Sequence, residues 1–97
     1  MAEIKTVGVI GAGQMGTGIA HVCALAGYEV ALNDITEERI EAGLRTIRAN
    51  MARQVAKGYI TEDKMEAGLA HIHPAVKLDQ IGQADLAIEA ATEDEEV

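Results

Sequence analysis

Three glycines near the start of the chain, Gly11, Gly13 and Gly16, have the clearest chemical potential. They follow the short apolar run Val7–Ile10 in the pattern Gly-x-Gly-x-x-Gly. In this pattern the first glycine permits a tight turn out of a strand, the second lets backbone approach a ligand closely, and the third lets a helix pack tightly on a sheet. The amides and dipole at that helix start can then hold phosphate oxygens. The candidate cofactor-binding residues of this turn are Gly11, Ala12, Gly13, Gln14, Met15 and Gly16.

An acidic residue, Asp34, stands twenty-three positions after Gly11, at the end of the next apolar segment. A carboxylate in this place accepts hydrogen bonds from both hydroxyls of an adenosine ribose. It also repels a 2′-phosphate, and Ile35 offers no cation to offset that repulsion, although Arg39 one turn further on can weaken it. Together, the glycine turn and Asp34 predict dinucleotide binding, with NAD(H) preferred over NADP(H). The alternative is a merely tight turn, in which Asp34 only opens the next helix.

A second candidate group lies on one side of a predicted long helix. At about 100° per residue, four side chains project within a narrow arc opposite the apolar stripe: Arg39, Asn50, Arg53 and Lys57. Three cations on one helix face can hold a polyanionic substrate, such as a phosphorylated carrier. The alternative is a solvated helix surface, which is the usual fate of such charges and which spacing alone favours.

Other reactive residue types give weaker signals. Cys23 is expected to be a small core residue rather than a reactive thiol. His71 and His73 would point to one side of a strand, but no cysteine or further histidine lies nearby in the sequence to complete a metal site. Glu89 and Glu93 lie at the end of the last predicted strand, where either could contact the cofactor or simply be solvated. We therefore assign no metal ligand and no catalytic residue within this sequence.

Length and composition bound the function further. The 97 residues suffice for one small domain, whereas a complete dinucleotide-binding domain needs two βαβαβ halves, so we expect part of a longer protein. A net charge of −8 argues against nucleic-acid binding, which relies on cations that neutralise phosphates. There is no apolar run long enough to cross a bilayer and no signal-peptide pattern. The single cysteine excludes an internal disulfide and favours the reducing cytoplasm.

The elements that must position these residues follow from hydrophobic periodicity. Strands are predicted at Lys5–Ile10, Tyr28–Asn33, His71–Val76 and Asp85–Ala91, the last of them buried. Pro74 lacks an amide donor and suits an edge strand. The first helix begins near Gly13 or Gln14 and stops at Gly27. Its apolar residues at helical spacing are Met15, Ile19, Val22, Cys23 and Ala26.

The second helix is the clearest element of the pattern. Thr36 is a good N-cap, and Gly58 follows the predicted end near Lys57. Its apolar stripe comprises Ile40, Leu44, Ile47, Met51 and Val55. Thr61 caps a further short helix, which completes an αα-hairpin. The order β-α-β-α-α-β-β predicts an α/β fold: a partial Rossmann-type, doubly wound parallel sheet with a helical hairpin inserted after the second strand.

Several segments resemble the 3-hydroxyacyl-CoA dehydrogenases, and among these most of all the bacterial 3-hydroxybutyryl-CoA dehydrogenases. The glycine motif is shared by many dehydrogenases, but the hairpin insertion and Glu-Ala-Ala-Thr-Glu at 89–93 are more selective. The similarity covers essentially the whole chain. Its segments are Val9–Gly16, Ile19–Ala20, Leu25–Val30, Asn33–Asp34, the hairpin and Ile88–Glu93.

This resemblance implies reversible oxidation of a 3-hydroxyacyl-CoA to the 3-ketoacyl-CoA, with NAD as hydride acceptor. It implies that the hairpin helps bind coenzyme A, which makes CoA contact by Asn50, Arg53 and Lys57 slightly more favoured than solvation. It also adds residues at the end of the last predicted strand to the cofactor site. These are Ala90, Ala91 and Glu93.

The resemblance also predicts what residues 1–97 lack. The family's general base is a histidine in a later segment, oriented by a glutamate, with a serine and an asparagine near the substrate carbonyl; His21, His71 and His73 match none of these. We expect an incomplete N-terminal NAD-binding domain, inactive alone, without the helical C-terminal domain for substrate closure and dimerisation that makes the whole protein a homo-oligomer. Three alternatives stay open: a non-catalytic NAD(H) sensor, a 3-hydroxy acid dehydrogenase that does not use CoA, and a piece that binds nothing well.

Overall fold

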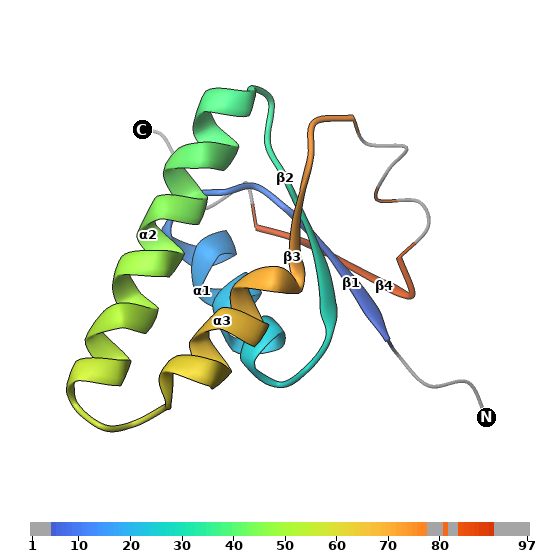
Figure 1. The fold of residues 1–97 in the computed structure, drawn as a ribbon. Helices are drawn as coiled ribbons and strands as arrows, with labels where there is room; N and C mark the ends of the chain where they lie inside the picture. The colour runs from blue at the N-terminus through green and yellow to red at the C-terminus, as the bar shows by residue number, and fades with distance from the viewer. Residues whose placement is uncertain (1–4, 78–80, 82–83, 91–97) are drawn as a thin grey trace.

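The computed structural model of the chain describes residues 5–77, 81 and 84–90 (Figure 1). Its four strands and three helices follow one another in the predicted order β-α-β-α-α-β-β. Their bounds are β1 (Thr6–Ile10), α1 (Gln14–Leu25), β2 (Glu29–Asn33), α2 (Glu37–Ala56), α3 (Glu62–Ala70), β3 (Ile72–Ala75) and β4 (Leu86–Glu89). Among the described helices, none is both long enough and apolar enough to cross a membrane.

The four strands form one parallel sheet in the order β3-β2-β1-β4. Val9 in β1 lies opposite Leu32 on one side and Ile88 on the other. Within these four strands β3 is at an edge, as the position of Pro74 predicts. The chain runs from β1 towards β3 and then returns to the far side of β1. In open α/β sheets, the crevice at such a reversal is where ligands bind, at the carboxyl ends of the strands.

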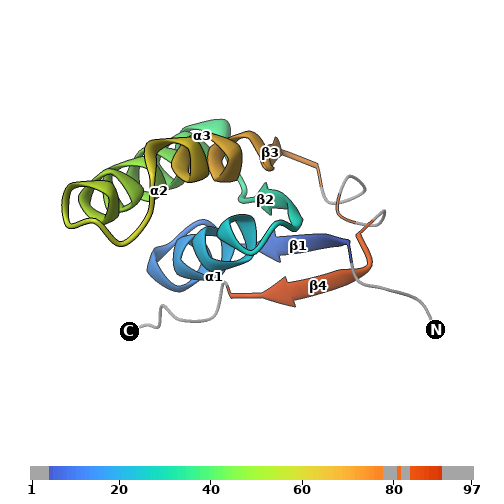
Figure 2. The same ribbon diagram turned by 60° about the horizontal axis from the view of Figure 1, so that its bottom comes forward.

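All three helices cover the same face of the sheet (Figures 1 and 2). Alternation along β1 points Val7 and Val9 into the core beneath them. Gly8 faces the other way, where the buried side chain of Ile81 lies so close that a Cβ on Gly8 would be 2.6 Å from its Cγ2 atom. The fully buried large side chains are Leu32, Ile40, Ile47, Met51, Val9 and Val30.

Helix α2 forms as its sequence predicts. The Thr36 hydroxyl accepts a hydrogen bond from the Arg39 amide at 3.2 Å and caps the first turn. After the C-cap at Lys57, Gly58 adopts a left-handed φ of 80°, which ends the helix. Of the predicted stripe, Ile40, Ile47 and Met51 are buried, and the other two residues are half-buried. Thr61 caps α3 in the same way, so the predicted αα-hairpin is confirmed.

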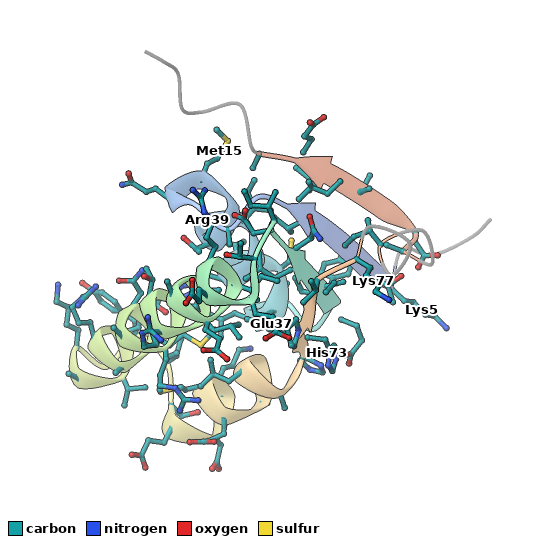
Figure 3. The ribbon with its side chains drawn as sticks, turned by 90° about the horizontal axis from the view of Figure 1, so that it is seen from above. Lys5, Met15, Glu37, Arg39, His73 and Lys77 are labelled. Carbon is teal, nitrogen blue, oxygen red and sulfur yellow. The ribbon has the colours of Figure 1, made fainter. Side chains whose placement is uncertain are left out.

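Helix α1 packs through a face that only partly matches the predicted apolar row: Ile19 and Cys23 are half-buried against the core, but the other residues of the row are exposed. Met15 and Val22 are 47% and 68% exposed, and Met15 projects outward from the start of the helix (Figure 3). The buried residues are instead Gly16, Thr17, Ala20, His21 and Ala24. Except for His21, these residues are small, because α1 must approach the sheet and both other helices closely. The last strand also differs from its prediction: Leu86 in β4 is 41% exposed rather than buried.

Asp85 joins the starts of β1 and β4. Its Oδ2 atom accepts hydrogen bonds from the Lys5 amide at 2.8 Å and the Thr6 amide at 3.1 Å. These donors favour the carboxylate form and lower the pKa of Asp85. Because the folded-state pKa is lowered, the stabilisation is present above the unfolded-state pKa and is lost as the pH falls through the folded value.

We therefore expect Asp85→Asn to lower the free energy of unfolding at neutral pH. The deficit should shrink as the pH falls below the ordinary aspartate pKa of 3.8, because the parent carboxyl then loses its charge too. Urea unfolding of both proteins over a pH series measures this, with Glu66→Gln on the exposed side of α3 as the matched control. A deficit that does not change with pH would contradict the assignment.

Candidate cofactor-binding site

The turn from β1 into α1 is shaped by glycines that cannot carry side chains. Gly11 has a φ of 107°, a left-handed conformation that favours glycine. A Cβ on Gly16 would lie 1.7 Å from the Gly11 carbonyl oxygen, so only glycine lets the helix come this close to the turn. Gly13 is the N-cap, and its carbonyl accepts the first helical hydrogen bond, from the Thr17 amide at 2.9 Å. The start of α1, with the positive end of its helix dipole, therefore lies at this turn, which is the arrangement that binds anions.

Asp34 lies directly against this turn. Its Oδ2 atom accepts a hydrogen bond from the Ala12 amide at 2.8 Å, and its Oδ1 atom accepts one from the Ile35 amide at 2.6 Å. The half-buried carboxylate is thus held in a fixed orientation, while each oxygen keeps a further lone pair for a ligand. The structure brings together the glycine turn and the acid that the sequence associates with an adenosine ribose.

Asn33, which sequence reasoning did not single out, braces the same edge of the sheet. Its side chain is only 5% exposed, and its amide nitrogen donates to the carbonyls of Ala75 at 2.6 Å and Val76 at 3.3 Å. The Gly11 amide donates to the Asn33 carbonyl at 2.8 Å and extends the β1–β2 ladder into the turn. Only the position of Asn33, immediately before Asp34 at a strand end, could have indicated this role.

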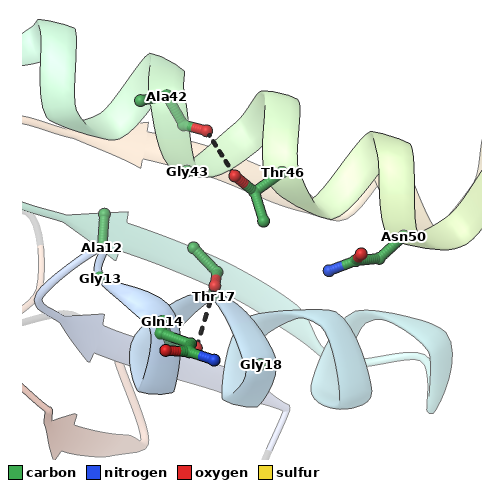
Figure 4. A pocket seen from close by; sticks show the side chains of 9 residues that line it. All are labelled: Ala12, Gly13, Gln14, Thr17, Gly18, Ala42, Gly43, Thr46 and Asn50. Carbon is green, nitrogen blue, oxygen red and sulfur yellow. Dashed lines mark hydrogen bonds between the residues drawn. The ribbon is translucent and has the colours of Figure 1, made fainter.

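A pocket of about 530 Å³ opens between the start of α1 and the middle of α2 (Figure 4). Its polar side chains are uncharged. The Thr17 hydroxyl donates to the Gln14 carbonyl and the Thr46 hydroxyl to the Ala42 carbonyl, both at 3.1 Å, so each hydroxyl proton is used within its own helix. The Asn50 side chain points into the pocket from α2.

Gly43 sets how closely α2 approaches the glycine turn. A Cβ on this residue would lie 3.1 Å from the Ala12 Cβ and 3.0 Å from the Thr17 Cγ2 atom. Sequence reasoning missed Gly43, although a glycine inside a helix, where it destabilises, is a signal of close packing. The pocket thus lies directly beside the turn because one small residue allows it.

Two of the four residues predicted to share a helix arc come together at the pocket. The Arg53 guanidinium donates to the Asn50 Oδ1 atom, so a cation stands beside a pocket-lining amide. Lys57 is the exposed C-cap of α2 one turn further on. Arg39 lies in the first turn of α2, about 21 Å from Arg53 at the standard helical rise, so the four do not form a single site.

Two of the chain's histidines lie at the other end of the sheet. His71 Nδ1 and His73 Nε2 contact the two oxygens of the Glu29 carboxylate at 2.6 and 2.7 Å, where β2 and β3 begin. These ring donors lower the pKa of Glu29. His73 on β3 is labelled in Figure 3. Within the described residues, no group of three potential metal ligands forms.

The remaining predicted residues are placed only in part. The Ala90 amide donates to the Ile10 carbonyl at 2.8 Å, so Ala90 is buried beside the glycine turn. Glu89 is exposed at the end of β4, whereas Ala91 and Glu93 lie outside the described residues. Cys23 packs half-buried against the core, where burial raises the pKa of its thiol and makes it less reactive.

Comparison with known proteins places this geometry in a family. The sequence profile described as 3-hydroxyacyl-CoA dehydrogenase, NAD binding domain, matches residues 6–97. A 3-hydroxybutyryl-CoA dehydrogenase of Bradyrhizobium diazoefficiens is 55% identical over 96 residues, which are 99% of this chain and 33% of that protein. A 3-hydroxyadipyl-CoA dehydrogenase of Escherichia coli is 39% identical over 97 residues, which are 100% of this chain and 20% of that protein.

A solved structure agrees. The crystal structure of (S)-3-hydroxybutyryl-CoA dehydrogenase from Ralstonia eutropha superposes with a TM-score of 0.91 at 38% identity, covering 96% of this chain and 33% of that one. The chain therefore spans about a third of the length of these two 3-hydroxybutyryl-CoA dehydrogenases. The family profile, the whole-chain identity and the superposition show that the chain belongs to the 3-hydroxyacyl-CoA dehydrogenase family, as its NAD-binding domain.

Proposed function

We propose that the protein containing this chain interconverts 3-hydroxyacyl-CoA and 3-ketoacyl-CoA, 3-hydroxybutyryl-CoA in particular, by hydride transfer with NAD. Two of the relatives named above, one of them a solved structure, are 3-hydroxybutyryl-CoA dehydrogenases by name, which supports this proposal. The chain has a single cysteine, Cys23, whose half-buried thiol is free, and this supports the reducing cytoplasm as the location of the protein.

The observation that best supports NAD binding is the direct contact between Asp34 and the glycine turn. The 2.8 Å hydrogen bond from the Ala12 amide fixes the carboxylate beside the helix start that can hold a diphosphate. One ligand with two phosphates and an adjoining ribose satisfies both features at once. NAD, when bound, accepts the hydride; the residues of this chain bind and orient its adenosine half and exclude a 2′-phosphate.

We propose that the general base comes from outside residues 1–97. The chain has three histidines, and each is already engaged: His21 with Gln54, and His71 and His73 with Glu29. Glu29 stands where β2 begins, at the end of the sheet opposite the glycine turn. A base must lie within hydrogen-bond reach of the substrate hydroxyl. We expect the isolated chain to bind NAD without turning over substrate.

We further propose that Asn50, Arg53 and Lys57 contact the coenzyme A part of the substrate. Two observations support this: the uncharged pocket beside the glycine turn, which suits an amide-bearing chain, and the cation that stands next to Asn50. Arg53 and Lys57 are exposed and one helical turn apart, a spacing that suits adjacent phosphates.

Charge reversal at Arg53 tests the proposed contact with coenzyme A. In the full-length protein, Arg53→Glu should raise the KM for acetoacetyl-CoA about tenfold, roughly the effect of 1.4 kcal/mol in binding, and leave the Kd for NADH unchanged. Arg48→Glu is the matched control, because Arg48 is equally exposed on another side of the same helix. An unchanged KM in the Arg53 variant would show that Asn50, Arg53 and Lys57 do not form part of the substrate site.

The reaction itself is tested by substrate choice. NADH oxidation by the full-length protein should proceed with acetoacetyl-CoA and be negligible with free acetoacetate at the same concentration. Equal rates with the two substrates would favour a dehydrogenase that does not need coenzyme A. Tight NADH binding without any turnover would favour a sensor.

A further inference from the structure

His21 is a buried titratable residue that the binding site described above does not use. It lies in the middle of α1, and only 8% of its surface is exposed. Its Nε2 atom lies 2.7 Å from the Oε1 atom of Gln54 in α2. Because an amide oxygen only accepts hydrogen bonds, Nε2 carries the proton and donates it. Buried polar groups are costly without such partners, so this contact is a specific link between the two helices.

Gln54 is anchored at both ends. Its backbone carbonyl accepts the Tyr59 amide at 2.9 Å, where the chain turns out of α2, while its side chain reaches across to His21. It directly follows Arg53 and stands one turn before Lys57. The last turns of α2, which present these two cations, are therefore held to α1 through one side chain.

Helix α1 connects this anchor to the cofactor turn. Its N-cap is Gly13, about 12 Å from His21 at the standard rise. Nearer its N-terminus, α2 packs against the glycine turn at Gly43, where the contacts with Ala12 and Thr17 are apolar or steric. Apolar contacts set how far apart two helices lie but are not directional, whereas a hydrogen bond requires a defined angle. The His21–Gln54 hydrogen bond therefore fixes how the C-terminal turns of α2 are rotated about the helix axis.

We propose that His21 is a positioning residue for substrate binding. By holding Gln54, it orients the α2 turn that carries Arg53 and Lys57 relative to the start of α1, where the cofactor binds. The ring itself touches neither cofactor nor substrate. This inference rests on the proposed contact between that turn and coenzyme A.

The test compares variants of the full-length protein. His21→Leu removes the donor and leaves the Gln54 oxygen without its partner, and we expect a rise of about five- to tenfold in the KM for acetoacetyl-CoA, with kcat and the Kd for NADH little changed. His21→Gln should restore the parent KM, because its amide nitrogen can occupy the place of Nε2. Gln54→Leu removes the same link from the partly exposed side and serves if His21→Leu does not fold. The double variant should be no worse than either single one.

The outcomes separate this inference from the function on which it rests. Arg53→Glu raising the KM while folded His21→Leu and Gln54→Leu leave it unchanged would overturn the positioning role alone. A parallel loss of NADH affinity in His21→Leu would also overturn it, because the residue would then support only the fold. A raised KM in His21→Leu with no effect of Arg53→Glu would reject the proposed coenzyme A contact and, with it, the positioning role stated through that turn. No effect in any variant would reject both.

Discussion

Replacing Gly16 with alanine should abolish NADH binding. The new Cβ would lie 1.7 Å from the Gly11 carbonyl oxygen and 2.9 Å from its carbon. These are backbone atoms, so no side chain can rotate away, and either α1 must retreat from the turn or the turn must open. Overpacking of a well-packed site typically costs about 1–3 kcal/mol. Either movement also displaces the amides that would hold the diphosphate, so we expect the Kd for NADH to rise at least ~100-fold.

Gly18→Ala is the matched control for this change. It makes the same substitution two residues later in the same helix, where a Cβ would meet no atom within 4 Å. Alanine should slightly stabilise α1 there, by up to about 1 kcal/mol, without altering NADH affinity. Calorimetric titration with NADH and thermal unfolding should be measured on both variants. A Gly16→Ala protein that is folded and binds NADH as the parent does would show that the diphosphate does not sit on this turn.

The second large effect concerns the choice between the two nicotinamide cofactors. Asp34→Asn keeps the shape of the side chain and one oxygen for the Ala12 amide, but it removes the negative charge. Hydrogen bonds to charged groups contribute about 1.5–3 kcal/mol, so the Kd for NADH should rise roughly 10- to 100-fold. NADPH affinity should stay constant or improve, because the 2′-phosphate no longer meets a carboxylate.

Titrating both cofactors into the parent and the variant measures this change in preference. Glu38→Gln is the control, because it removes the same charge from an exposed site in the first turn of α2 without touching the glycine turn. It should shift the two affinities equally and only slightly. A parent protein that binds NADPH as tightly as NADH would contradict the role assigned to Asp34.

The geometry of the candidate cofactor site could be predicted from the sequence because its signals are local. The glycine spacing specifies the turn whatever packs around it, and Asp34 follows from the length of one βαβ unit. The caps of the hairpin, Thr36 and Thr61, are equally local, since each side chain bonds an amide three residues on. These features rest on backbone geometry within a few residues, and the structure confirms the fold they imply.

The remaining features depend on which faces meet in three dimensions. The sequence of α1 offers an apolar row, yet the helix buries its small residues, because a close approach to the sheet and to two helices excludes larger ones. The link from His21 to Gln54 joins residues thirty-three positions apart and has no periodic signature. Gly43 matters only because Ala12 lies opposite it. Such contacts follow from tertiary packing, which residue spacing alone does not specify.

A crystal structure of the NADH complex would show whether the glycine turn and Asp34 hold the cofactor together. We expect both adenosine ribose hydroxyls on the Asp34 carboxylate and the diphosphate on the amides of the first turn of α1. The α2 side of the neighbouring pocket, at Thr46 and Asn50, should stay clear of the cofactor. A complex with the ribose away from Asp34, or with the diphosphate against Thr46 and Asn50 instead of the first turn of α1, would contradict the proposed site.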